Sequence, residues 1–171
     1  QSDQVILVGD FARNLEIISS LEYLVGSDDW EKASDDILKI KGIDWSETKS
    51  GPFTLKGTLE GQSLEISVYW TDKVNFVQKQ LLLSASPQHL QLEVQENKSM
   101  GKAIVESQAK SEEEFFAGLD LQFIPPELRE GADEIVLAKE GKLPKLLEEG
   151  DLKGILHNHS TYSDGKHSLR Q

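Results

Sequence analysis

The chain has 171 residues, which fits one domain, or one domain and part of a second. Thirty acidic against 18 basic residues give a net charge of −12, which disfavours binding of nucleic acid through bulk positive charge. The absence of cysteine excludes disulfides, cysteine zinc ligands and a thiol nucleophile, and no apolar run is long enough to cross a membrane. These features are typical of a cytoplasmic protein.

The first predicted element is a buried strand over residues 5–8, because a short apolar run there is ended by Gly9. The residues that follow predict a helix over residues 10–18. A second strand is predicted over residues 20–25, where the side chains alternate between two faces. One of these faces carries Leu21, Tyr23 and Val25, and the other carries Ser20, Glu22 and Leu24.

The next elements are a helix and a β-hairpin. An N-cap at Asp28 predicts a helix that extends to about residue 40. Residues 53–59 and 62–70 predict the hairpin, because the Glu-Gly pair between them supplies the positive φ angle that a tight turn needs. Alternation along the second of these strands directs Glu65 away from the apolar face.

Helices and then an acidic segment follow the hairpin. Thr71 and Asp72 predict the cap of a helix over residues 73–83, and Ser86 followed by Pro87 predicts another helix start. A capping box predicts a short helix from Ser111 through Phe116. Residues 110–151 then carry 12 acidic and 5 basic side chains, and Pro125-Pro126 interrupts regular structure. We therefore expect a soft domain boundary within residues 124–150.

A histidine pair near the end of the chain is the strongest chemical signal. His157 and His159 are two residues apart in a strand-like segment, so both imidazoles project from the same face. Asp164, in a loop with Gly165, can fold back toward them. Imidazole and carboxylate groups are common metal ligands. The spacing therefore predicts a metal site, with two exposed loop histidines as the alternative.

The segment from Gly154 to Gly165 resembles the first motif of the PHP (polymerase and histidinol phosphatase) domain, a distorted β/α barrel that binds metals. The resemblance implies that His157, His159 and Asp164 are ligands of zinc, manganese or iron. The remaining ligands of this family come from later strands, and the sequence stops at Gln171. A working site would therefore need the remainder of the PHP domain.

The resemblance extends upstream. Residues 123–130 (FIPPELRE) and the acidic connector after them are similar to bacterial and archaeal family X DNA polymerases, in which a palm and thumb precede a PHP domain. The implied fold is α+β, a mixed α/β arrangement: a nucleotidyltransferase-like palm sheet with helices on one face, a smaller thumb-like part, and the first strand of a truncated PHP barrel. The chain begins without methionine, and we expect it to be a piece of a longer protein. The implied divisions are a palm at 1–85, a thumb at 86–130, an acidic connector at 131–153 and the start of the PHP domain at 154–171.

The nucleotide-binding residues implied by this resemblance are incomplete. Family X palms hold the triphosphate with a Gly-Ser motif at a helix N-terminus, followed by two basic residues. Here Gly9 and Arg13 correspond to the retained glycine and one basic residue. Asp10 replaces the serine and would repel phosphate, and Ala12 replaces the other basic residue.

The implied metal site of the palm is altered as well. The family holds two Mg²⁺ ions with three aspartates, whose positions are occupied here by Ser20, Glu22 and Glu65. Glu22 and Glu65 would be the residual catalytic carboxylates and would bind one Mg²⁺ or Mn²⁺ weakly; the alternative is two solvated glutamates. His89 matches a histidine of the family's base-contacting turn, while Leu90 replaces its asparagine; the alternative for His89 is a surface residue near an N-cap.

Three functional hypotheses follow. The first is a family X-type DNA polymerase homologue of the DNA repair class, whose degenerate palm positions gapped or single-stranded DNA for a C-terminal PHP phosphoesterase or 3′→5′ exonuclease. The second is a non-catalytic structural or protein-interaction module attached to a PHP phosphatase, which an acidic surface with an exposed apolar patch would favour. The third, an active palm, is disfavoured by the substitutions above. We expect the present piece to be inactive by itself.

Overall fold

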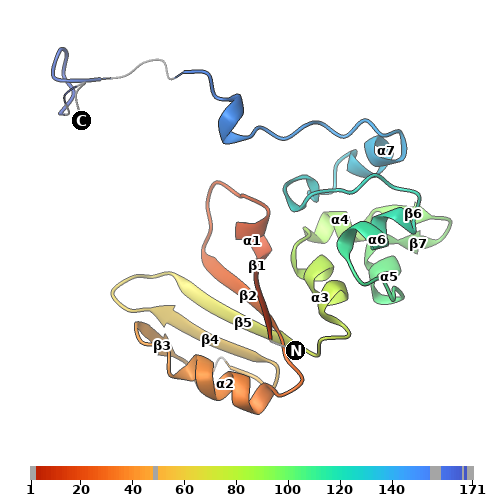
Figure 1. Cartoon of the computed structure of the whole chain (residues 1–171), viewed down its shortest axis with the longest axis horizontal. Coiled ribbons are helices and arrows are strands. Elements are labelled where there is room, and N and C mark those ends of the chain that lie inside the picture. Colours follow the sequence, from red (N-terminus) through yellow and green to blue (C-terminus); the bar gives the residue numbers. More distant parts are fainter. Residues whose placement is uncertain (1–2, 48–49, 155–158, 167, 169–171) are drawn as a thin grey trace.

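The computed structural model describes residues 3–47, 50–154, 159–166 and 168 (Figure 1). A sheet half is followed by a helical half, and the chain then leaves both. The sheet half contains β1 (Gln4–Val8), α1 (Gly9–Ala12), β2 (Ser20–Gly26), α2 (Trp30–Leu38), β3 (Ile43–Trp45), β4 (Thr54–Leu59) and β5 (Glu65–Thr71). The rest contains α3 (Phe76–Leu83), α4 (Pro87–Gln91), β6 (Glu93–Gln95), β7 (Lys98–Ser99), α5 (Met100–Val105), α6 (Glu112–Ala117), η1 (Pro126–Leu128), α7 (Glu134–Lys139) and η2 (Glu149–Asp151).

The five strands of the sheet half lie in the order β1-β2-β5-β4-β3. The β2–β5 pair is parallel, and the other three pairs are antiparallel. The molecule therefore has the predicted α+β class with a mixed sheet. The predicted hairpin is confirmed as β4 and β5, with Gly61 of its turn at a φ of +74°. Strand β3, which pairs with β4, was not expected from the sequence because it has only three residues.

Helices cover both faces of this sheet, so the expectation of helices on one face is wrong. On one face α2 packs against a cluster that includes Val25, Ile66 and Val68. On the other face Phe76 of α3 packs against Val8 and other side chains of β1, β2 and β5. This second packing follows from strand alternation, because β1, β2 and β5 also carry apolar side chains on this face, among them Ile6, Leu24 and Tyr69.

Three predicted helix limits are also wrong. The helix expected over residues 10–18 is only the four-residue α1, because Asn14 adopts a left-handed φ of +54° that a helix cannot continue through. Asp29 rather than Asp28 caps α2, since its side chain accepts from the backbone N–H of Lys32. The helix expected from residue 73 begins at Phe76, after a turn in which the Asp72 carboxylate accepts from the N–H of Asn75.

The helical half has its own core. Eleven buried residues from α3, β6, α5, α6, α7 and the connecting loops form one cluster, to which β6 contributes Val94. The predicted caps at its helix starts are confirmed, because Ser86 accepts from the N–H of His89 and Ser111 accepts from the N–H of Glu114. None of the helices among the described residues is long and apolar enough to cross a membrane.

Candidate metal and nucleotide site

Polar side chains gather on the sheet face that meets α1. In the parallel β2–β5 pair, Ser20 lies opposite Glu65, and Glu22 lies opposite Ser67. In the neighbouring β4–β5 pair, Lys56 lies opposite Ser67. Register partners on adjacent strands project from the same face. The sheet therefore brings together the two glutamates that the sequence singled out, and it adds a lysine that the sequence did not point to.

Lys56 offsets one of the two carboxylate charges, because it forms an ion pair with Glu65. Its Nζ lies 3.2 Å from Oε1 of Glu65, and both side chains are about one third exposed. The bond to Glu65 raises the pKa of Lys56 above its ordinary value, and the Glu22 carboxylate adds to this effect. The hydroxyl of Ser20 donates to Oε1 of Glu22 at 3.1 Å. The positive charge beside the glutamates is thus a protonated ammonium.

Among the described residues, the cluster lacks a third carboxylate. No group of three histidine, aspartate or glutamate side chains among the described residues could hold a metal ion. The remaining neighbour is Tyr69, whose pKa is raised by burial and by the nearby Glu22 carboxylate, so that its hydroxyl stays protonated. Two carboxylates, one of them ion-paired, do not supply the oxygen ligands that a pair of Mg²⁺ ions requires.

Gly9 places the start of α1 directly against Glu22. Its φ is +68°, and a Cβ built there would lie 2.9 Å from the carboxyl carbon of Glu22. Only glycine combines this backbone conformation with so close an approach. The residue that the sequence assigned to triphosphate binding is buried and is packed against a carboxylate.

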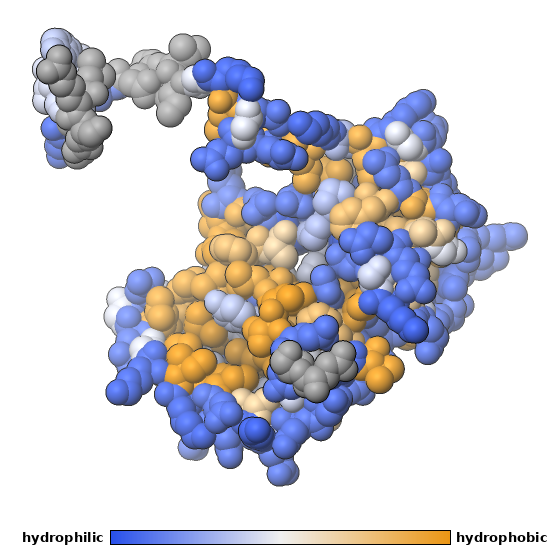
Figure 2. All heavy atoms as spheres, in the orientation of Figure 1, coloured by the Kyte–Doolittle hydropathy of each residue, from blue (hydrophilic) through white to orange (hydrophobic). Residues whose placement is uncertain are grey.

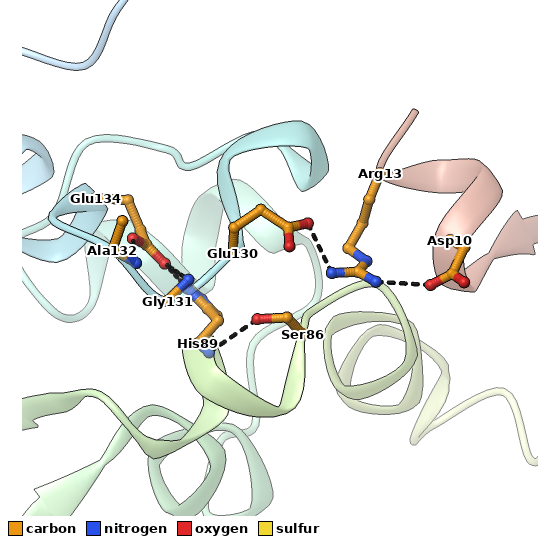
Figure 3. Close-up of polar contacts among 8 residues, drawn as sticks. All are labelled: Asp10, Arg13, Ser86, His89, Glu130, Gly131, Ala132 and Glu134. Atoms are coloured by element: carbon orange, nitrogen blue, oxygen red, sulfur yellow. Dashed lines mark hydrogen bonds and ion pairs between the residues drawn. The ribbon is translucent and has the colours of Figure 1, made fainter. Parts of the chain in front are cut away.

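Arg13 is held between the two halves of the molecule (Figure 3). One guanidinium nitrogen lies 2.6 Å from Oδ1 of Asp10, and another lies 2.6 Å from Oε1 of Glu130 in the helical half. The Arg13 side chain is only 9% exposed, and the next residue, Asn14, donates to Glu127 at 3.0 Å. A nucleotide phosphate that approached Arg13 would have to displace a carboxylate of the chain itself.

His89 is buried, so its interpretation as a surface residue is wrong. Its side chain is 1% exposed and its Nδ1 lies 2.7 Å from Oε1 of Glu134. The same carboxylate accepts from the backbone N–H groups of Gly131 and Ala132, at 2.7 and 2.6 Å (Figure 3). This network ties α4 to α7 inside the helical half, and His89 has a structural partner for its ring nitrogen.

The structure describes two of the three metal ligands predicted near the end of the chain, His159 and Asp164. His157 lies outside the described residues. His159 and Asp164 are in contact through Nδ1 and Oδ1, and the bond from His159 lowers the pKa of the Asp164 carboxyl. The loop does fold back as the sequence suggested, bringing these two side chains together.

A substitution of Lys56 tests how the cluster is neutralised. Lys56→Met should strengthen Mn²⁺ binding about tenfold, because the two glutamates then lack a cation. Titration calorimetry with Mn²⁺ measures the change, and Lys32→Met on the exposed surface of α2 is the matched control. An equal gain in both variants would contradict the role given to Lys56.

Comparison with known proteins gives one informative match. No protein-family model matches the chain. Over 61 residues it is 46% identical to the DNA polymerase/3′-5′ exonuclease PolX of Bacillus subtilis (strain 168). The chain is similar to a family X DNA polymerase. The match covers 36% of this chain and 10% of the length of that relative. The predicted relationship to family X is confirmed at this level, while the PHP assignment and the degenerate palm stay predictions.

Proposed function

We propose that this chain is the DNA-positioning part of a family X-type polymerase homologue that has lost nucleotidyl transfer. The observation that carries the proposal is the ion pair between Lys56 and Glu65, beside a hydrogen bond from Ser20 to Glu22. A fixed ammonium stands next to the carboxylates that would hold catalytic metal ions. The similarity to PolX supports DNA as the substrate class.

The chemistry of nucleotidyl transfer explains why this cluster is unsuited to it. Two metal ions must contact both the attacking oxygen and the leaving oxygen, and three carboxylates normally fix them. Here Ser20 supplies only a hydroxyl, and Lys56 competes for Glu65. A lysine ammonium neutralises charge, but it cannot bind and orient both reacting oxygens as a pair of metal ions does.

The contacts of Arg13 support a positioning role. Its guanidinium joins Asp10 of the sheet half to Glu130 of the helical half, and Asn14 adds a bond to Glu127. These bonds hold the palm-like and thumb-like halves in one arrangement without a nucleotide. A fixed palm and thumb suit a module that presents DNA, whereas a polymerase must admit and release nucleotides.

In this proposal the hydrolytic chemistry belongs to the PHP part of the longer protein. His157, His159 and Asp164 would be its first metal ligands. The proposal is supported by the contact between the His159 imidazole and the Asp164 carboxylate, two groups of the kind that bind divalent metal ions. A divalent metal ion bound there would supply a water of lowered pKa for phosphoester hydrolysis. The side chains themselves would fix the position of the ion.

DNA binding measured with and without polymerase cofactors tests the proposal. Fluorescence anisotropy with a gapped duplex at low salt, where charges are least screened, should show binding that Mg²⁺ and deoxynucleotide leave unchanged. An intact duplex of the same length is the control and should bind more weakly. Extension of the primer, or binding that tightens with both cofactors together, would contradict the loss of nucleotidyl transfer.

A second candidate function is a protein-interaction module. Two observations favour it: the excess of 12 negative charges, and an apolar groove of about 560 Å³ on the sheet half. Absence of DNA binding at low salt would leave this candidate in place of the first. The groove carries a more specific inference.

A further inference from the structure

One face of the five-stranded sheet is covered by a single short helix. Strands lie about 4.8 Å apart, so five of them are roughly 20 Å wide, whereas a helix with its side chains covers about 10 Å. Helix α2 has nine residues, which corresponds to a length of about 13 Å. A helix of this size covers about half of the width of the face and, among the described residues, leaves the rest without a neighbouring element.

The uncovered part forms a groove between α2 and the strands, with a volume of about 560 Å³. Its floor comes from β1, β2, β5 and the end of β4, and its walls come from α2, the residues just after α2, and β3. The side chains most relevant here are Val5, Tyr23, Val25, Ile37, Ile40 and Ile66. Val5 is 60% exposed and Ile40 is 52% exposed. Figure 2 shows that apolar residues gather on this half of the molecule, above the polar rim.

The charged side chains that line the groove are two carboxylates. Asp3 and Asp36 lie along it, and α2 adds the exposed Asp35 close by. Asp3 shares the ammonium of Lys73 with Asp28, each at 3.4 Å, so one positive charge there faces two carboxylates. Asp36 has a neighbour in Lys39 at 2.9 Å, but both side chains are more than 60% exposed, and such pairs contribute little. A partner that carried lysine or arginine beside its apolar surface would be attracted, while a polyanion would be repelled.

We propose that the groove binds an amphipathic α-helix of a partner protein, with an apolar stripe flanked by lysine or arginine. The groove lies on a face of the sheet and is lined by side chains, whereas the backbone edges of the outer strands β1 and β3 point sideways. An occupant of the groove must therefore satisfy its own backbone hydrogen bonds, as a helix does. A helix laid beside α2 would also match the missing width of the layer. Apolar residues spaced at i, i+3, i+4 and i+7 would contact the exposed Val5 and Ile40 and the partly buried Tyr23.

A synthetic peptide is the probe. It has about 16 residues, leucines at helical spacing on one face and lysines beside them. The fluorescein-labelled peptide is titrated with the intact chain by anisotropy, and circular dichroism follows its helicity. Binding should be saturable and should raise helicity. A peptide of the same composition with leucines at every second position is one control, and a peptide with glutamate in place of lysine is another; both should bind about tenfold more weakly.

Two groove variants complete the test. Ile40→Glu and Val5→Glu should each weaken peptide binding about tenfold. Both side chains are already more than half exposed, so the fold should persist, which circular dichroism checks. Leu38→Glu is the matched control, since Leu38 is the last residue of α2, two positions before Ile40, is 45% exposed and is not among the residues that line the groove. It should leave binding unchanged.

Four results would overturn the proposal. The first two are equal binding of all three peptides and the absence of any saturable binding. The third is an equal loss of peptide affinity in Ile40→Glu and Leu38→Glu. The fourth is self-association of the chain that Ile40→Glu abolishes, because a second copy of the chain would then be the occupant. The proposal does not rest on the proposed DNA function. No assay here contains DNA, so the two can fail separately.

Discussion

Replacing Arg129 with methionine should lower the free energy of unfolding by about 3–5 kcal/mol, because the change leaves a shielded carboxylate without its partner. The Arg129 side chain is 0% exposed, and its Nη1 lies 2.9 Å from Oε1 of Glu112, which is 12% exposed. The unpaired Glu112 would keep its desolvation cost and lose the attraction that offsets it.

Arg129 also joins several elements of the helical half. Its Nε donates to the backbone oxygen of Ile124 at 2.9 Å, and its guanidinium lies 5.3 Å from the ring centre of Phe116 and 5.8 Å from that of Phe123. The backbone oxygen of Arg129 accepts from Ser86 at the start of α4. A lysine cannot reproduce this planar, several-donor geometry, so Arg129→Lys should recover only part of the lost stability.

Urea unfolding followed by far-ultraviolet circular dichroism measures the free energy of unfolding of Arg129→Met and of the chain with Arg129 in place. The double variant Arg129→Met with Glu112→Leu removes both charges and should regain most of the stability, because an apolar pair needs no desolvation of ions. Lys142→Met, at an exposed position, is the control for loss of a positive charge. A double variant as unstable as Arg129→Met would show that the ion pair is not the source of the effect.

The sheet half was largely predictable because its signals are local. Alternation along β2 and β5 directs Glu22 and Glu65 to one face, and the register of the parallel pair places them on adjacent strands. Alternation cannot show which side chain arrives from the next strand. Lys56 comes from β4 of the hairpin, and only the register of that pair sets it beside Glu65.

The helical half was less predictable because its polar contacts join residues far apart in the sequence. Arg129 and Glu112 are separated by 17 positions, and His89 and Glu134 by 45. Each of these residues alone is typical of a solvated surface, and no local pattern indicates burial. The apolar groove was not predictable for a similar reason. The periodicity of α2 indicates that the helix packs against a sheet, but it does not indicate how much of the sheet the helix covers.

Replacing Glu134 with alanine should cost about 3–5 kcal/mol of folding free energy, because it leaves several buried donors without an acceptor. The Glu134 carboxylate is 5% exposed and accepts from Gly131, Ala132 and the ring of His89. Burial opposes its ionised form, but the bonds from His89 and the backbone N–H groups prevail and hold the pKa of Glu134 below its ordinary value. Glu134→Gln keeps one acceptor oxygen and should cost less.

The same network predicts a pH dependence. Burial lowers the pKa of His89, with Arg129 adding to this effect and Glu134 opposing it. Since the unfolded chain then binds a proton before the folded chain does, stability should fall as pH drops below about 6.5, and should fall further as Glu134 titrates below about 4.5. His89→Gln should remove the upper step.

Both halves can be followed separately in this experiment. The three tryptophans of the chain, Trp30, Trp45 and Trp70, lie in the sheet half, whereas His89 and Glu134 lie in the helical half. Hydrogen exchange of α4 and α7 should accelerate in acid and in Glu134→Ala, while tryptophan fluorescence changes less. A stability profile that is flat from pH 7 to pH 5, with the same profile in His89→Gln, would contradict a neutral, buried His89 as the link between these helices.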